Sequence, residues 1–214
     1  STKERPKQFI PFFGDFTLFD LTLQRINNRD IFKKPIIVTS EEYLSLVEES
    51  LSKTGLEVEK IFLEPEPKNT FSASVLPVMD ALKRNEKERY MVMPSDHYIP
   101  FNKSFYETCT IIKNQFRKKA LILLGVAPDN PSTEYGYISV DTSNEEIKRV
   151  KSFIEKPDLE KAKLLIKQPD TLWNSGMFFF DGKWLSDSIQ IKKLETYSLM
   201  HDLLPTSELS HIYF

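Results

Sequence analysis

Asp96 stands where a carboxylate can meet a ligand. It follows a short apolar run, Tyr90 to Met93, which Pro94 ends; such a run is typical of a buried strand. In open α/β sheets, ligands bind beyond the carboxyl ends of the strands. Mg²⁺ prefers carboxylate and water oxygens, often together with substrate phosphates, so Asp96 is a candidate metal ligand. The alternative is that Asp96 only caps the next turn or helix.

Three further loops hold residue types that bind anions or hydroxyl groups. Pro6-Lys-Gln8 places a lysine early in the chain, and Phe153-Ile-Glu-Lys-Pro157 sets an acid beside a base. Trp173-Asn-Ser-Gly-Met177 offers an amide, a hydroxyl and a glycine that lets a ligand approach the backbone. Each also has a purely structural explanation: surface charges at Glu155 and Lys156, or a turn at Asn174.

The elements that must position these loops alternate between strands and helices in the first part of the chain. Apolar, β-branched runs predict strands at 35–39, 60–64, 90–94 and 120–126. Helical spacing of apolar residues predicts helices at 17–27, 41–54, 70–83 and 105–117. We therefore expect an α/β fold, Rossmann-like, with a mixed, mostly parallel sheet flanked by helices. Pro77 should kink the third helix or move its start.

The character of the sequence changes after Val126. Strands are predicted at 135–140, 147–155 and 173–181, and helices at 158–168 and 184–189. Gly136 lies in the first of these strands, where it serves a ligand or only fills a bulge. No linker divides the chain, so we expect one domain over 1–214, with halves of about 1–126 and 127–214.

Composition excludes some classes of partner. The net charge of −2 favours neither a nucleic-acid nor a membrane partner. No stretch approaches the roughly 18 apolar residues of a membrane span. The single cysteine, Cys109, fits a reducing compartment, hence the cytoplasm. Its apolar neighbours predict a buried position on a helix.

Taken in order, the motifs resemble those of the sugar-1-phosphate nucleotidyltransferases, and most of all the members that form GDP-mannose. The matching blocks are Pro6-Lys-Gln8, Pro94-Ser-Asp-His97, Glu134-Tyr-Gly-Tyr-Ile138, Phe153-Ile-Glu-Lys-Pro157 and Trp173-Asn-Ser-Gly-Met-Phe178. Val38-Thr-Ser-Glu-Glu-Tyr43 and Glu64-Pro-Glu-Pro-Lys-Asn-Thr70 are similar to two further blocks. Five or more blocks in the right order are far more specific than a lone motif.

The resemblance implies a Mg²⁺-assisted transfer of GMP from GTP to mannose 1-phosphate, which gives GDP-mannose and pyrophosphate for polysaccharide biosynthesis. A sugar phosphate oxygen would attack the α-phosphorus in line. Catalysis of such a transfer is mostly positioning and charge neutralisation. The sequence agrees, because it shows no convincing Ser–His–Asp or Cys–His arrangement.

On the nucleotide side, the resemblance implies that Asp96 holds Mg²⁺ and that Lys7 neutralises phosphate charge. Asn69 and Thr70 would lie at the base or ribose, and Ser95 would also contact the nucleotide.

On the sugar side, the resemblance implies that Lys156 binds the sugar phosphate. Glu155 and Asn174 would bind sugar hydroxyls, and Gly136 would let the backbone approach the sugar.

The sequence also departs from the family. The family's glycine-rich phosphate loop precedes Pro-Lys-Gln, whereas the first glycine here is Gly14, so we expect that loop to lie outside this sequence. A late second metal-binding aspartate is not found. Three alternatives stay open: another sugar 1-phosphate, another nucleotide such as dTTP or UTP, and a non-catalytic homologue that senses a nucleotide sugar. A homo-oligomer is compatible with all of them.

Overall fold

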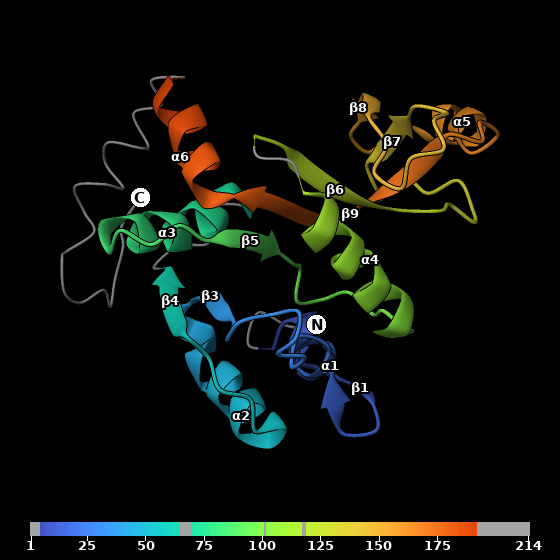
Figure 1. Ribbon diagram of the computed structural model, residues 1–214. Coiled ribbons are helices and arrows are strands. Elements are labelled where there is room, and N and C mark those ends of the chain that lie inside the picture. The colour runs from blue at the N-terminus through green and yellow to red at the C-terminus, as the bar shows by residue number, and fades with distance from the viewer. Residues whose placement is uncertain (1–4, 65–69, 101, 117–118, 192–214) are drawn as a thin grey trace. The chain divides into compact units, whose positions relative to one another are not determined.

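Figure 1 shows the chain, whose internal contacts divide it into two compact units. A computed structural model describes residues 5–64, 70–100, 102–116 and 119–191. The first unit comprises Ser1–Glu88, Pro94–Thr110 and Asp181–Phe214, and the second comprises Arg89–Met93 and Ile111–Phe180. The units therefore interleave along the chain. The expected division of function between residues 1–126 and 127–214 stays a prediction.

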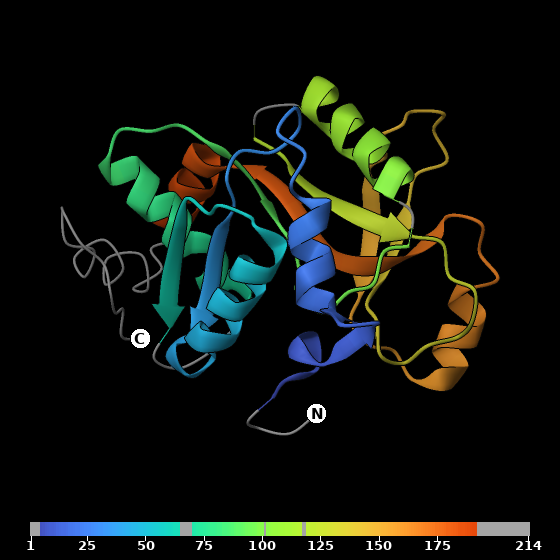
Figure 2. The same cartoon turned by 90° about the horizontal axis from the view of Figure 1, so that it is seen from below.

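The first unit contains a pair of parallel strands, β3 (Ile36–Ser40) and β4 (Lys60–Glu64). The 3₁₀ turn η2 (Glu41–Tyr43) and helix α2 (Leu44–Thr54) connect them, and Figure 2 shows α2 lying along the pair. Parallel neighbours need such a crossover. Gly55 ends α2 at a φ of 64°, a left-handed conformation that glycine adopts without a steric penalty.

The N-terminal part of this unit leads into a capped helix. It contains the 3₁₀ turn η1 (Lys7–Phe9), the antiparallel pair β1 (Pro11–Phe13) and β2 (Phe16–Thr17), and helix α1 (Leu18–Arg25). The backbone N–H of Asp20 donates to Thr17 Oγ1 at 3.0 Å, and that of Thr17 donates to Asp20 Oδ2 at 2.9 Å. This reciprocal capping box satisfies two donors at the start of α1.

Helices α3 (Thr70–Lys83) and α6 (Gly182–Ile191) pack side by side in the first unit (Figure 1). The predicted helix at 70–83 is confirmed, and it continues through the buried Pro77 as one helix. Burial of apolar area against α6 compensates for the backbone hydrogen bond that proline cannot make. The buried residues at this contact are Val75, Leu76, Met79 and Ile189.

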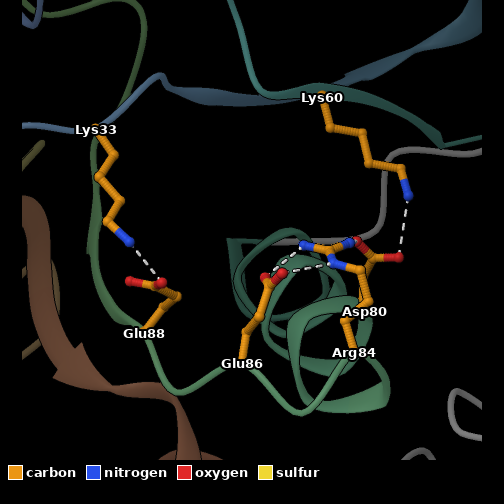
Figure 3. A network of polar contacts seen from close by, with 6 residues as sticks. All are labelled: Lys33, Lys60, Asp80, Arg84, Glu86 and Glu88. Atoms are coloured by element: carbon orange, nitrogen blue, oxygen red, sulfur yellow. Dashed lines mark hydrogen bonds and ion pairs between the residues drawn. The ribbon is translucent and has the colours of Figure 1, made fainter.

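Charged side chains join the end of α3 to the neighbouring strand (Figure 3). Asp80 pairs with Lys60 of β4 at 3.0 Å and with Arg84 one helical turn later. Arg84 also pairs with Glu86 at 2.9 Å, and the hydrogen bond to Glu86, with help from Asp80, raises the pKa of the guanidinium. The network ties the start of β4 to the C-terminal end of α3.

The second unit is a five-stranded sheet in which most pairings are antiparallel. The strand order is β5-β9-β7-β8, and β6 also pairs with β9. β9 is antiparallel to β6 and β7, and β7 is antiparallel to β8. The strands are β5 (Arg89–Val92), β6 (Leu121–Val126), β7 (Tyr137–Val140), β8 (Val150–Ile154) and β9 (Thr171–Asp181).

The mixed α/β fold that we expected is confirmed, but its strands are less uniformly parallel than predicted. Parallel pairing is found in β3–β4, whereas β6, β7 and β8 make antiparallel pairs. The physical reason is connection length. Only residues 141–149 separate β7 from β8, and a parallel neighbour would need a crossover of a dozen residues or more.

One face of this sheet is covered by α5 (Leu159–Leu165), which buries Tyr137, Ala162 and Leu165 against Trp173. Helix α4 (Asn102–Gln115) carries Cys109, which is buried as predicted. Burial raises the pKa of its thiol to about 12, so the reactive thiolate is scarce near neutral pH. Within the described ranges, every helix is too short or too polar to cross a bilayer.

Candidate functional site

Lys7 and Asp96 are distant in sequence and form an ion pair in the first unit. Lys7 Nζ lies 2.6 Å from Asp96 Oδ2, and His97 Nε2 lies 3.6 Å from Oδ1 of the same carboxylate. The Lys7 side chain is 65% exposed and that of Asp96 is 26% exposed. Ser95 shares the turn with Asp96. The structure thus places a solvent-facing cation against a partly sheltered acid.

Aromatic packing holds the turn that carries Lys7. In η1, the backbone N–H of Phe9 donates to Pro6 O at 3.0 Å. The Phe9 ring is buried and meets the Phe19 ring of α1 edge-on, with 5.2 Å between centroids. The Tyr43 ring also lies near Phe9, with 6.2 Å between centroids. Because Phe9 anchors the turn inward, Lys7 is left pointing outward.

Asp96 fits a Mg²⁺ ion that takes one carboxylate from the protein and its other ligands from substrate and water. Within the residues that the structure describes, no group of three or more His, Cys, Asp or Glu side chains could hold a metal by itself. Mg²⁺ commonly binds one or two carboxylates and takes its other ligands from substrate phosphates and water. Asp96 is accessible enough for that mode. Its assignment as a metal ligand stays a prediction.

Gly136, Glu155 and Asn174 converge in the second unit, where the start of β7 and the end of β8 lie beside β9. Tyr137 of β7 pairs with Ile154 of β8 and with Trp173 of β9. One step along, Gly136 therefore lies opposite Glu155 on one side and Asn174 on the other. The backbone N–H of Asn174 donates to Gly136 O at 2.7 Å, which agrees with this register.

Gly136 is needed because two side chains occupy the space beside it. A Cβ at this position would lie 2.9 Å from Glu155 Oε2 and 2.9 Å from Cζ of Phe153, closer than such atoms normally approach. The groups that closely approach Gly136 are thus two side chains of the protein, Glu155 and Phe153. The glycine allows a carboxylate and an aromatic ring to lie side by side over the strand.

Asn174 has a structural role through its amide oxygen and carries an NH₂ group that can donate hydrogen bonds. Its Oδ1 accepts from the backbone N–H of Gly176 at 3.2 Å, as in a turn-forming asparagine, and Gly176 has a φ of 71°. This bond uses the acceptor end of the amide. The NH₂ group keeps its two donor hydrogens. It can therefore donate a hydrogen bond to the oxygen of a sugar hydroxyl.

Lys156 is held in an unusual backbone conformation at the exposed end of the same region. Its φ is 37°, and Pro157 follows it. Positive φ is unfavourable for a residue with a side chain, and such strain is concentrated at functional sites. Of the remaining predicted residues, Asn69 lies outside the described part of the chain, and Thr70 begins α3.

Glu64 is a candidate residue to which the sequence motifs assigned no role. It ends β4, opposite Ser40 of β3, at the carboxyl edge of the parallel pair, where ligands bind in such sheets. The side chain is buried, and Oε1 has no hydrogen-bond partner among the described residues. Burial raises the pKa of this carboxyl. The available signal was an acid at the last position of a predicted parallel strand.

We expect Glu64→Gln to raise the melting temperature at about pH 8 and to change it little at about pH 4. Because the pKa of Glu64 is raised above 4.5, the folded protein binds this proton more tightly than the unfolded chain does. The associated stability is therefore present below about pH 4.5 and is lost as the pH rises through the folded-state pKa. Thermal unfolding over this range measures it. The exposed Glu59→Gln is the control, and an equal pH response of both variants would contradict the prediction.

A pocket of about 270 Å³ lies elsewhere in the first unit, beside α1 and α2. Its lining includes Phe9, Asp20 and Lys53. Asp20 and Lys53 already pair with each other at 2.9 Å. The pocket lining contains none of the residues predicted from the motifs, so we regard it as a gap between helices rather than as the site.

Comparison with known proteins identifies the family of this chain and several of its relatives. The Nucleotidyl transferase family matches residues 2–207. Alginate biosynthesis protein AlgA of Pseudomonas aeruginosa is 35% identical over 183 residues, 84% of this chain and 38% of AlgA. A mannose-1-phosphate guanylyltransferase of Sinorhizobium fredii is 32% identical over 197 residues, 91% of this chain and 38% of the relative. The chain thus spans 38% of these relatives' length. A solved structure described as mannose-6-phosphate isomerase from Helicobacter pylori has a TM-score of 0.82 at 27% identity, covering 98% of this chain and 82% of that one.

Proposed function

This chain belongs to the Nucleotidyl transferase family, and from that membership we propose that it transfers GMP from GTP to mannose 1-phosphate. The products are GDP-mannose and pyrophosphate. Relatives named for alginate and xanthan biosynthesis support a role of the product in polysaccharide synthesis.

One observation carries the proposal: the contact of Lys7 with Asp96 at 2.6 Å. The motifs suggested these residues separately, one for phosphate charge and one for a metal. Their contact joins a cation and an anion at one place. This suits a reaction in which negative charge must be neutralised and no protein nucleophile is required.

Asp96, Lys7 and Lys156 have different roles in the proposed transfer. When Mg²⁺ is bound, it supplies charge neutralisation on phosphate oxygens, and Asp96 would hold it. A phosphate oxygen of mannose 1-phosphate forms a bond to the α-phosphorus of GTP, and the bond from that phosphorus to the bridging oxygen of pyrophosphate breaks. Lys7 stabilises the charge on the nucleotide phosphates, and Lys156 binds the sugar phosphate.

Glu64 is the residue that would favour binding of guanine over the pyrimidine bases. Guanine presents two neighbouring N–H donors on its pairing edge, and a carboxylate offers two acceptor oxygens. Uracil and thymine present a single N–H between two carbonyl groups, which would repel a carboxylate. Oε1 of Glu64, at the edge of β3–β4, has no hydrogen-bond partner in the part of the chain that the structure describes. It is therefore the acceptor that we assign to the base.

The test is pyrophosphate release by the full chain with Mg²⁺ and mannose 1-phosphate, with GTP, dTTP, UTP and ATP supplied separately. We expect release with GTP alone. Release with UTP or dTTP instead would keep the chemistry and overturn the base assignment. Nucleotide binding without release in any mixture would contradict the catalytic proposal and favour a sensing homologue.

Lys156→Gln should weaken binding of mannose 1-phosphate by about 1.5–3 kcal/mol, the usual contribution of a hydrogen bond to a charged group, with GTP binding unchanged. Lys156→Gly should lose the same affinity but raise stability by roughly 1 kcal/mol, because glycine tolerates the positive φ. Calorimetric titration and thermal unfolding measure the two effects.

Lys161→Gln, an exposed lysine of α5, is the control and should change neither quantity. If Lys156→Gln weakened GTP binding as much as sugar phosphate binding, the role of Lys156 would be wrong.

A further inference from the structure

Phe153 is a large apolar side chain left open to solvent beside the proposed sugar-binding residues. It lies on β8, at the edge of the five-stranded sheet, and 47% of it is exposed. Exposure of an aromatic ring next to a cluster of polar groups is typical of ligand sites, which combine apolar surface with a few placed polar groups.

The register of the sheet sorts the surrounding side chains into two rows. Ile138 of β7 pairs with Phe153 of β8 and with Leu172 of β9. These three form an apolar row. A second row lies two residues further along each strand, on the same face of the sheet. In it, Gly136 lies between the polar residues Glu155 and Asn174.

The two rows touch at Gly136. A Cβ there would meet Glu155 Oε2 at 2.9 Å and two atoms of the Phe153 ring, Cζ at 2.9 Å and Cε2 at 3.3 Å. The carboxylate and the ring edge therefore lie side by side over one glycine. A ligand bound by Glu155 would therefore have the exposed ring beside it.

We propose that Phe153 forms the apolar part of the sugar subsite and packs against the C–H face of the hexose whose hydroxyl groups Glu155 binds. This inference rests on the proposed function and deepens it. A pyranose ring presents hydroxyl groups around its edge and C–H groups on its faces. The electron-rich face of an aromatic ring attracts such C–H groups, while a carboxylate accepts hydrogen bonds from the edge.

The adjacent acid favours a sugar over a protein partner. The buried centres of protein interfaces are depleted of charged residues, whereas Glu155 lies directly beside the Phe153 ring. A hexose satisfies both groups at once. Docking of a second copy on Phe153 is the competing outcome that the experiment must distinguish.

The experiment compares steady-state kinetics of the full chain with those of Phe153→Ala, Phe153→Leu and Phe153→Tyr. We expect the alanine variant to raise the KM for mannose 1-phosphate about five- to tenfold and to change the KM for GTP less than about twofold. Tyrosine should restore the wild-type KM, and leucine should fall between. Val150→Ala is the matched control, because Val150 lies on the same strand and is 48% exposed.

Unchanged sugar KM values, or equal increases for both substrates, would overturn the role of Phe153. So would loss of a dimer in Phe153→Ala, seen by sedimentation, with the sugar KM unaffected. If the wild type released no pyrophosphate with any nucleotide, the proposed function would fail by itself. Mannose 1-phosphate binding by saturation-transfer NMR would then decide: weaker binding to Phe153→Ala upholds the inference, and equal binding or none refutes it.

Discussion

Asp96→Asn is expected to lower kcat about 10²–10³-fold, the usual effect of removing one electrostatic group from a transfer site, and to abolish the dependence on Mg²⁺ concentration. The amide keeps the size of the side chain but removes the charge that would hold the metal. Chelation of Mg²⁺ should abolish wild-type activity in the same way. Initial rates over a Mg²⁺ titration measure both effects.

The loss should be functional rather than structural. The pair of Asp96 with Lys7 is partly exposed, and such pairs contribute about 0–1 kcal/mol to stability. The melting temperature should therefore shift by less than about 4 °C. Glu88→Gln is the control, because Glu88 pairs with Lys33 at the same 2.6 Å and comparable exposure. Normal turnover in Asp96→Asn would remove Asp96 from the metal site.

Lys53→Met is expected to destabilise the folded state by roughly 3–5 kcal/mol, because it leaves a buried carboxylate without its countercharge. Asp20 is 1% exposed, and Lys53 Nζ lies 2.9 Å from its Oδ2. The pair joins α1 to α2, and α1 supports the turn that carries Lys7 through the contact of Phe19 with Phe9. Chemical denaturation measures the loss.

The effect should depend on pH in a defined direction. Burial by itself would raise the pKa of Asp20, but hydrogen bonds from Thr17, Ser50 and Lys53 outweigh it and hold the pKa below 3.8. The stabilisation is thus present above about pH 3.8 and is lost as the pH falls through the folded-state pKa. The deficit of Lys53→Met should shrink at low pH, where Asp20 is protonated.

Two further variants test this explanation. Adding Asp20→Asn to Lys53→Met should recover part of the lost stability, because it removes the stranded charge. Lys103→Met, which breaks a 3.8 Å pair between exposed residues of α4, should cost less than about 1 kcal/mol. A double variant no more stable than Lys53→Met would contradict the charge argument.

Local patterns predicted most of the elements. The strand at 60–64 is found as β4, and the helix at 70–83 as α3. Apolar periodicity and turn residues act over a few positions, so they can be interpreted without the fold. The same patterns did not show that β7 and β8 pair antiparallel, because pairing joins segments that are distant in sequence.

The sequence by itself determined the chemical groups of the candidate site and their order along the chain. These are Lys7, Asp96, Gly136, Glu155 with Lys156, and Asn174. Only the tertiary structure decided which of them meet. Lys7 contacts Asp96 because Phe9 buries the turn beside it, and Gly136 lies between Glu155 and Asn174 because β7 is hydrogen-bonded to both β8 and β9. Register depends on long-range burial of one sheet face, and a shift of one residue would turn these side chains to the other face. That is why Phe153 could be recognised only from the fold.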